Sequence, residues 1–178
     1  KQWVSLKKQY LRWSVISNTT RHVGIVVNDL EKTRDFWINT IGFKLHIEAR
    51  EESPYIDELL AIRNPGLTTV KLIDSKGFII ELLKFENYQV GNSWSGNLKT
   101  TGLTHIALTV DDLDELAAKL KEENYQTLSE IKLSPNKKVK VLFIRGPEAI
   151  MLELVQELEW IHQIFEDSIK VASSERMP

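Results

Sequence analysis

Two histidines and two glutamates stand at matching positions in the two halves of this 178-residue chain. His22 and His105 each open a short apolar run, in the segments RHVGIVVNDL (21–30) and THIALTVDDL (104–113). In both segments Val follows the His by five residues, Asp by seven and Leu by eight. A sequence motif that occurs twice in one chain predicts a duplicated structural module.

The two glutamates lie in the middle of the last apolar run of each half, as Ile80-Glu81-Leu82 and Leu152-Glu153-Leu154. A carboxylate inside an apolar strand costs free energy unless a positive group pairs with it. If the first and last strands of each half border one cleft, two imidazoles and two carboxylates converge there. This donor set suits a divalent ion (Zn, Ni, Co, Mn or Fe) with open positions for water or substrate oxygens. The alternative is two buried His–Glu pairs without a metal.

Strands and helices are expected in the same order around both copies. Period-two alternation predicts strands over 22–28 and 103–110, each with one bulky face and one face of small or polar residues that includes the His. Asp29 and Asp112 predict the N-termini of helices over 30–41 and 113–124. Further strands are expected over 43–51, 67–73 and 78–85 in the first half and over 126–133, 138–145 and 149–156 in the second.

These elements predict an α+β fold of two tandem βαβββ modules whose curved, mixed sheets surround a shared cleft. Module 1 spans 21–85, a linker spans 86–101 and module 2 spans 102–157. The extra length of module 1 falls in the loop at 52–66, where a helical turn is expected over 56–61. An N-terminal extension (1–20, with a short helix over 6–13) and a C-terminal segment (158–178, with a helix that begins at about 157 and ends at about 172) flank the modules.

The composition excludes several classes of function. A net charge of −2 with mixed signs and no long basic run argues against nucleic-acid binding. No apolar stretch is long enough for a membrane span, and the first residues lack the apolar core of a signal peptide. The absence of cysteine removes thiolate nucleophiles and Cys-ligated zinc. We therefore expect a cytoplasmic protein that acts on a small-molecule substrate.

The repeated motifs resemble those of the vicinal oxygen chelate superfamily. This superfamily includes glyoxalase I, methylmalonyl-CoA epimerase, extradiol dioxygenases, fosfomycin-resistance enzymes and bleomycin-binding proteins. The resemblance rests on the pattern that His22 opens, on the continuation Phe36-Trp37 and Ile41-Gly42-Phe43, and on the two Glu-centred strands. It covers roughly residues 21–157.

By this resemblance the four metal-ligand positions of the family are His22, Glu81, His105 and Glu153. Bleomycin-binding members lack the ligands, and the dioxygenases and fosfomycin-resistance enzymes do not use the position of Glu81. The full set therefore favours the glyoxalase and epimerase branch, in which a metal polarises a carbonyl and stabilises an enediolate while a carboxylate moves the α-proton. The resemblance implies a lyase, isomerase or epimerase, with Glu153 as the first choice of base and Glu81 as the second.

Two other functions stay open from the sequence. The same fold could serve as a non-catalytic binder of a small molecule, such as an antibiotic, or as an iron dioxygenase that uses His22, His105 and Glu153. Members of the family build the cleft either within one chain or between two copies in a homodimer. The sequence does not choose between these arrangements.

Departures from the family pattern bear on the substrate. Val26 and Phe85 stand where glutathione-using glyoxalase I has the Arg and Asn that hold the glutathione glutamyl group. Neither can pair with a carboxylate, so the sequence argues against glutathione and predicts a more apolar pocket wall. Gly77 is kept in the first turn, whereas Ala149 stands where the family usually has Gly in the second.

Several charged residues outside the repeated motifs have two possible roles. Lys137, Lys138 and Arg145 either meet an anionic substrate, such as a phosphate or CoA, or form a basic surface turn. Asp57 and Glu58 either reach the cleft or lie in a solvated loop. In both cases we expect the surface role.

Overall fold

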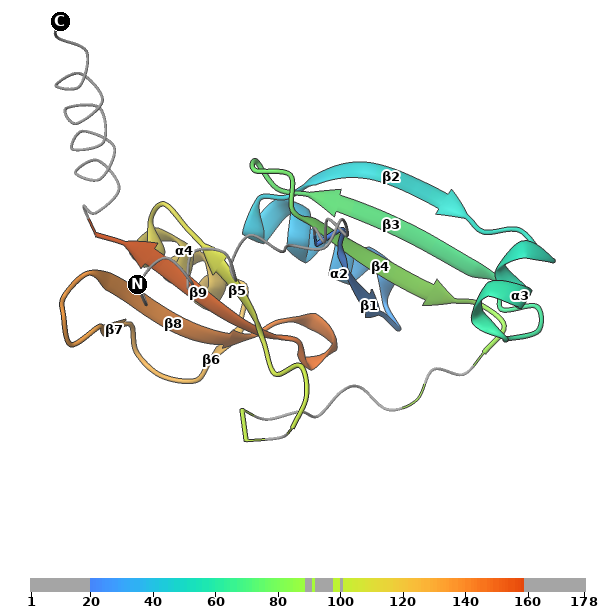
Figure 1. The fold of residues 1–178 in the computed structure, drawn as a ribbon. Helices are drawn as coiled ribbons and strands as arrows, with labels where there is room; N and C mark the ends of the chain where they lie inside the picture. The colour runs from blue at the N-terminus through green and yellow to red at the C-terminus, as the bar shows by residue number, and fades with distance from the viewer. Residues whose placement is uncertain (1–19, 89–90, 92–97, 100, 159–178) are drawn as a thin grey trace, which may run out of the picture.

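Two mixed β-sheets, one for each module, form the protein (Figure 1). The computed structural model describes residues 20–88, 91, 98–99 and 101–158. The first sheet has the strand order β1-β4-β3-β2, with β1 (Val23–Val26), β4 (Ile79–Phe85), β3 (Leu67–Ile73) and β2 (Lys44–Arg50). The second has the order β5-β9-β8-β6, with β5 (Ile106–Thr109), β9 (Met151–Glu157), β8 (Val139–Arg145) and β6 (Gln126–Thr127); β7 (Lys132–Leu133) also pairs with β8. The predicted α+β fold of two βαβββ modules is confirmed.

The strand pairing is the same in both modules and fixes the neighbours of each glutamate. The parallel pairs β1–β4 and β5–β9 place Gly24 beside Glu81 and Ala107 beside Glu153. On the other side the antiparallel pairs β3–β4 and β8–β9 place Lys71 and Phe143 in the equivalent positions. The two glutamates therefore share a small neighbour on one side and differ in the neighbour on the other.

A helix follows the first strand of each module, as predicted. Asp29 accepts a hydrogen bond from the Lys32 backbone N–H and caps α2 (Leu30–Asp35). Asp112 caps α4 (Leu113–Glu122) in the same way. The first helix continues as a π-helical segment, η1 (Phe36–Ile41), and ends at Gly42, whose φ is +98°. Both helices begin where predicted and the first ends where predicted, whereas α4 ends two residues before the expected 124. The wider turns of η1 have no counterpart in the apolar pattern of the sequence.

Three predicted strands of module 2 need correction. The strand expected over 103–110 is β5 (Ile106–Thr109), so His105 lies just before it. The strand expected over 126–133 is broken into β6 and β7, and the Ser129 hydroxyl between them donates a hydrogen bond to the Glu130 carbonyl. The strand expected over 149–156 begins only at Met151, after the short helix η2 (Pro147–Ala149). In module 1 the expected helical turn is α3 (Tyr55–Leu60).

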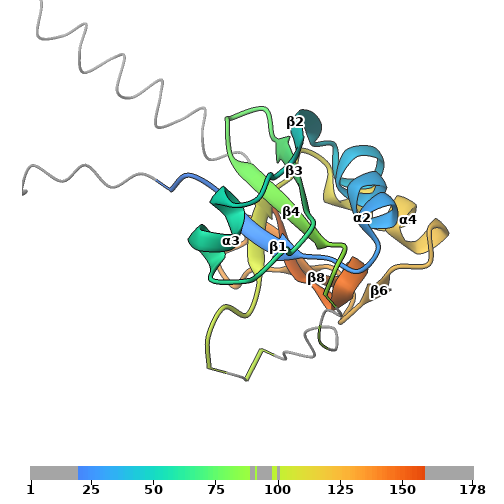
Figure 2. The same cartoon turned by 90° about the vertical axis from the view of Figure 1, so that its right-hand side faces the viewer.

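The two modules share one hydrophobic core. The first helix of module 1 and helix α4 of module 2 lie side by side in Figure 2. The rings of Phe36 and Tyr125 are 4.7 Å apart between centroids, and Thr40 donates a 2.5 Å hydrogen bond to Glu123. Burial of apolar surface across this junction stabilises the pair of modules as a unit. Fully buried members of this core include Val27, Trp37, Leu72, Ile80, Leu82, Leu113, Leu120, Ile144, Leu152 and Leu154.

Glu148 makes a second connection between the modules. One of its carboxylate oxygens accepts hydrogen bonds from the backbone N–H groups of Asn28 (2.8 Å) and Asp29 (2.9 Å). These two residues join β1 to α2, so module 2 fixes the start of the module 1 helix. The geometry requires a positive φ of 54° at Glu148 and 60° at Ala149.

Some expectations fall on residues outside the described part of the chain. They are the helix over 6–13 and all but the first two residues of the C-terminal helix, of which Glu157 belongs to strand β9 instead. Within the described part, no helix is long and apolar enough to cross a membrane.

We expect Ala149→Gly to raise the free energy of unfolding by about 0.5–1 kcal/mol. A left-handed backbone costs an L-residue about 1–2 kcal/mol, which exceeds the extra chain entropy that Gly adds to the unfolded state, about 0.4–1 kcal/mol. Urea denaturation measures the change. Gly77, with a φ of +92° and open space around it, is the matched control, and Gly77→Ala should lower stability by about 1 kcal/mol. A less stable Ala149→Gly variant would contradict this account of the turn.

Asp57 organises the loop around α3, so its carboxylate has a structural role. It accepts hydrogen bonds from the Ser53 hydroxyl (2.5 Å) and from the Asn64 backbone N–H (2.8 Å). The Ser53 hydrogen bond, the Asn64 hydrogen bond and the charge of Arg63 together hold the pKa of Asp57 below its ordinary value. The expected surface role is supported by these local contacts.

The lowered pKa gives the loop a defined pH dependence. Its stabilisation is present above the unfolded-state pKa of Asp and is lost as the pH falls through the folded-state pKa. We expect a titration of the Asp57 carboxyl by NMR to give a pKa below the ordinary value, and Ser53→Ala to move it upward. An unchanged pKa in Ser53→Ala would show that the hydroxyl does not hold the carboxylate.

Candidate functional site

The structure brings each predicted histidine together with the glutamate of its own module. His22 Nε2 lies 2.9 Å from Glu81 Oε2, and His105 Nε2 lies 3.1 Å from Glu153 Oε2. All four side chains are half-buried, with Glu81 at 12 % and Glu153 at 25 % exposure. The two carboxylates inside apolar strands are therefore both paired, as the cost of burying a lone charge requires.

The four residues form two pairs, one in each sheet. Within the described residues, no group of three or more His, Asp or Glu side chains lies close enough to hold a metal ion. A single chain thus contains two half-sites with two candidate ligands each. That the four share one cation stays a prediction.

The separation between donor atoms within each pair fits metal ligation. Two donors that each lie about 2.1 Å from a common ion are about 3.0 Å apart at the right angle of six-coordinate geometry and about 3.4 Å apart at the tetrahedral angle. The observed Nε2–Oε2 separations of 2.9 and 3.1 Å agree with the six-coordinate value. A direct His–Glu hydrogen bond has a similar length, so the distances are compatible with both alternatives raised from the sequence. The chemistry of the donors, imidazole nitrogen and carboxylate oxygen, suits Zn²⁺ and the neighbouring transition-metal ions.

The orientation of His105 is set by its neighbours. The Thr104 hydroxyl lies 2.9 Å from Nδ1, and the Phe143 ring packs edge-on at 5.3 Å between centroids. If Nδ1 donates its proton to the Thr104 oxygen, the Nε2 lone pair faces the Glu153 carboxylate, an arrangement that a cation stabilises. In the other tautomer, Nε2 donates to Glu153 and Thr104 donates to Nδ1. His22 has no such support from the described residues, none of which forms a hydrogen bond with its buried Nδ1.

The two carboxylates have different surroundings. Lys71 Nζ lies 2.7 Å from Glu81 Oε1, so one oxygen of Glu81 meets a lysine and the other meets His22. Phe143 takes the equivalent place in module 2 and gives Glu153 no positive partner. Sequence reasoning missed Lys71 and Phe143, although a signal was present. Each stands ten residues before its glutamate (81 − 71 and 153 − 143), directly across a hairpin.

A cavity of about 520 Å³ lies between the modules and has His105 in its wall. Its lining is mainly apolar and comes from β1, from the residues around the start of β5, and from the η2 turn. Val26 is in this wall, which agrees with the predicted apolar character, whereas Phe85 is not among its residues. The lining residues include Val23, Ile25, Val26, Leu103, Ile106, Ile150 and Met151.

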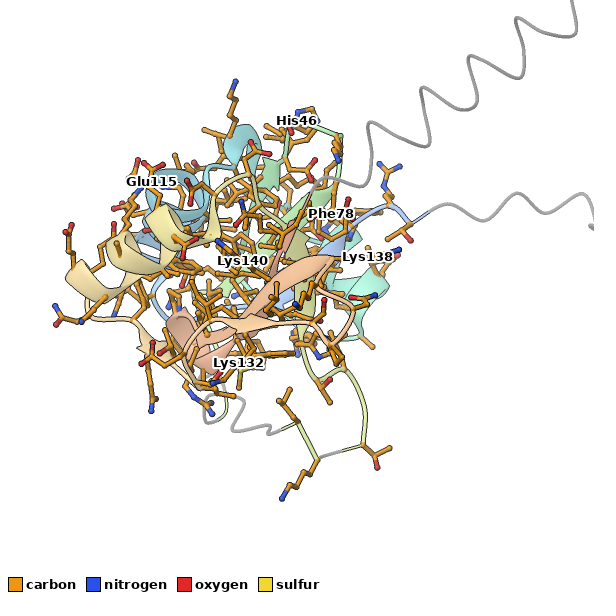
Figure 3. The ribbon with its side chains drawn as sticks, turned by 90° about the vertical axis from the view of Figure 1, so that its left-hand side faces the viewer. His46, Phe78, Glu115, Lys132, Lys138 and Lys140 are labelled. Atoms are coloured by element: carbon orange, nitrogen blue, oxygen red, sulfur yellow. The ribbon has the colours of Figure 1, made fainter. Side chains whose placement is uncertain are left out.

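Of the three basic residues considered for an anionic substrate, two lie in a turn and the third lies on a strand. Lys137 and Lys138 lie in the turn before β8, and Figure 3 labels Lys138 next to the start of that strand. Arg145 is half-buried on β8, two residues after Phe143 and thus on the same face of the sheet. Lys140, also labelled in Figure 3, alternates to the opposite face and bonds to Asp114 of α4.

Comparison with known proteins agrees with this architecture. Residues 21–143 match the family model of the Glyoxalase/Bleomycin resistance protein/Dioxygenase superfamily. The chain belongs to this superfamily. The predicted resemblance is therefore confirmed over most of the two modules.

Relatives within the superfamily are distant in sequence. The chain is 24 % identical to the uncharacterized protein YwkD of Bacillus subtilis over 80 % of its own length and 100 % of that protein. It is 27 % identical to the lactoylglutathione lyase of Neisseria meningitidis over 76 % of its length and 88 % of that enzyme. These likenesses leave the activity of the chain open.

Solved structures of superfamily members show the same fold. A glyoxalase family protein from Bacillus cereus superposes with a TM-score of 0.74 at 23 % identity, covering 82 % of this chain and 99 % of that one. Glyoxalase I from Zea mays superposes with a TM-score of 0.62 at 21 % identity, covering 80 % of this chain and 46 % of that one. Both likenesses concern the fold alone.

We expect Thr104→Val to weaken Zn²⁺ binding by about tenfold. The substitution removes the hydroxyl that fixes the His105 ring, and the partners that orient a metal-binding His typically account for 10–100-fold in affinity. Competition with a chromophoric chelator measures the affinity. Thr109→Val, on the exposed end of β5, is the matched control and should bind Zn²⁺ like the wild type. Equal affinities in all three proteins would rule out an orienting role for Thr104.

Proposed function

We propose that the protein is a divalent-metal-dependent lyase, isomerase or epimerase that moves a proton next to a carbonyl group. The observation that carries this proposal is the matched pair of His–Glu contacts, at 2.9 and 3.1 Å, in the same register of two duplicated sheets. One coincident pair would fit a structural role. Two pairs in equivalent positions, with donor types that bind Zn²⁺ and related ions, favour ligands of a metal centre.

We further propose that two copies of the chain complete this centre as a homodimer. Each chain offers two half-sites that its own fold keeps apart. In a twofold dimer, the His22–Glu81 pair of one copy and the His105–Glu153 pair of the other can meet, and the symmetry generates two equal centres. Large apolar side chains at the cavity support this arrangement, since Val26 is 45 % and Leu103 is 70 % exposed.

The different surroundings of the carboxylates favour Glu153 as the proton acceptor. Glu81 is held on both oxygens, by Lys71 and by His22, and is suited to remain a fixed ligand. Glu153 has His105 as its ionisable neighbour and Phe143 on its other side. Because it has fewer bonds to break, Glu153 can turn toward the substrate and take up the α-proton.

When bound, the metal ion would supply a Lewis acid for the carbonyl oxygen and for the negative charge that develops on it. The chain itself provides the other requirements. His22 and His105 fix the position of the centre, and Thr104 orients the second of them. The apolar wall that includes Val26 and Ile150 lies beside His105, and a second copy that covered it would exclude bulk water and strengthen the charge interactions in the site.

The proposed substrate is not a glutathione adduct. Val26 lies in the cavity wall and cannot pair with the glutamyl carboxylate. The neisserial relative, named lactoylglutathione lyase, shares only 27 % identity with this chain, so its substrate does not carry over. A smaller substrate with two neighbouring oxygens fits the site better.

The proposal predicts about one divalent ion per chain and exchange of an α-proton with solvent. Elemental analysis of freshly purified protein measures the ion, and NMR in deuterium oxide measures exchange with hydroxyacetone as a probe. Glu153→Gln should keep the ion but slow exchange by about a hundredfold, within the range of a lost general base. Glu157→Gln, on the exposed end of the same strand, should leave exchange unchanged.

Other outcomes would support the alternative functions. A protein that purifies without any ion and still binds small apolar molecules would be a binding module of the same fold. Iron in the centre with oxygen consumption that survives Glu81→Ala would indicate a dioxygenase built on His22, His105 and Glu153.

A further inference from the structure

Lys71 adds a positive charge to one half-site that the other half-site lacks. Its ammonium lies 2.7 Å from Glu81 Oε1, and its side chain is 22 % exposed. Strands β3 and β4 pair Lys71 directly with Glu81, so both side chains stand on the same face of the sheet. The equivalent position in module 2 holds Phe143, and Glu153 has no lysine or arginine within ion-pair distance in the described part of the chain.

A structural explanation of Lys71 is insufficient on energetic grounds. The duplicated module shows that this sheet position accepts an apolar ring beside a glutamate. A half-buried ion pair is often no more stabilising than a well-packed apolar side chain, because desolvation offsets the attraction. What distinguishes a lysine here is therefore its charge.

The charge balance of the assembled centre depends on Lys71. Histidines bind metals in their neutral form, so the ligands contribute two negative charges from the glutamates. With a divalent ion alone, the centre would be neutral. The Lys71 ammonium would leave it with one net positive charge.

We propose that Lys71 determines substrate specificity by fitting the loaded centre to a substrate with one negative charge at its chelating end. The chemical class is a 2-oxo or 2-hydroxy carboxylate, whose neighbouring oxygens can chelate while the carboxylate neutralises the centre. This inference rests on the proposed metal-dependent function. Arg145, a second cation on the corresponding face of module 2, has no acidic partner among the described residues and adds to the same positive field.

Two direct consequences follow from Coulomb attraction and repulsion at short range. The Lys71 ammonium competes with a metal ion for Glu81, so its removal tightens metal binding. It also attracts an anionic ligand of the centre. Its removal therefore weakens the binding of such a ligand and leaves the binding of a neutral ligand of the same shape unchanged. A merely structural lysine would not produce this opposite pair of effects.

The test compares the wild type with Lys71→Met in two equilibrium titrations. Zn²⁺ affinity is measured by chelator competition, and ligand affinity by the visible absorption of Co²⁺-loaded protein. The probes are glycolate, a monoanion with neighbouring oxygens, and hydroxyacetone, which is neutral. For Lys71→Met we expect Zn²⁺ to bind at least about tenfold more tightly, glycolate at least about tenfold more weakly, and hydroxyacetone within about threefold of the wild type.

Two control variants make the result specific. Lys71→Arg retains the charge and should resemble the wild type. Lys140→Met removes a half-buried strand lysine that pairs with Asp114 on the opposite face of module 2, and should change none of the three affinities. An unfolded Lys71→Met would be recognised by circular dichroism, and Lys71→Gln then takes its place with the same expected pattern.

The outcomes separate this inference from the proposed function. Wild-type protein that binds neither Zn²⁺ nor Co²⁺ overturns both. In the second case, the wild type binds the ion, but Lys71→Met lowers the affinities for glycolate and hydroxyacetone equally or leaves the glycolate affinity unchanged. That result overturns the role of Lys71 and leaves the metal centre standing. A loss of Zn²⁺ affinity in Lys71→Met would likewise show that the ammonium does not face the ion.

Discussion

The contact between the histidine just before the first strand of each module and the glutamate on the neighbouring last strand is the interaction on which the rest of this structure depends. Each glutamate lies inside an apolar strand, where an unpaired charge would be expensive. The parallel pairing of the first and last strand of each module brings the histidine to within 3.1 Å or less of it. Helices that pack on the opposite face fix this pairing, so the core and the site are built by the same strands.

Duplication makes the differences between the modules informative. A shared fold places equivalent residues in the same register, and selection for stability alone has no reason to treat the two glutamates differently. Glu81 is nevertheless held by Lys71, whereas Glu153 faces Phe143. His105 is supported by Thr104, whereas His22 has a buried nitrogen without a partner among the described residues. These differences suggest a division of work in which module 1 provides a fixed ligand and module 2 provides a mobile one.

Much of this arrangement could be predicted from the repeated pattern in the sequence. Period-two alternation placed His22 and His105 on the faces of small residues, and Asp29 and Asp112 predicted where the helices begin. The His–Glu partners within each module followed from equivalent positions in the two halves. The role of Lys71 required the hairpin register, because its distance from Glu81 along the chain reveals a contact only once the turn length is known.

Other features had no local signal. The π-helical segment keeps the apolar spacing of an α-helix, and the strand pattern runs through the break between β6 and β7. The Glu148 carboxylate meets Asn28 and Asp29 across the module boundary, a contact between residues about 120 positions apart. Whether half-sites meet within or between chains is likewise a matter of assembly, and assembly depends on surfaces rather than on strand periodicity.

The central claim is that the two kinds of half-site join across two copies of the chain, and mixing two inactive variants tests it most directly. One variant carries His22→Ala and Glu81→Ala, the other His105→Ala and Glu153→Ala, so neither homodimer has a complete centre. After the two are unfolded and refolded together, each heterodimer should contain one intact centre, and the mixture should recover about a quarter of the wild-type Zn²⁺ content with high affinity. Recovery of no metal from a mixture in which heterodimers are demonstrably present would contradict the account.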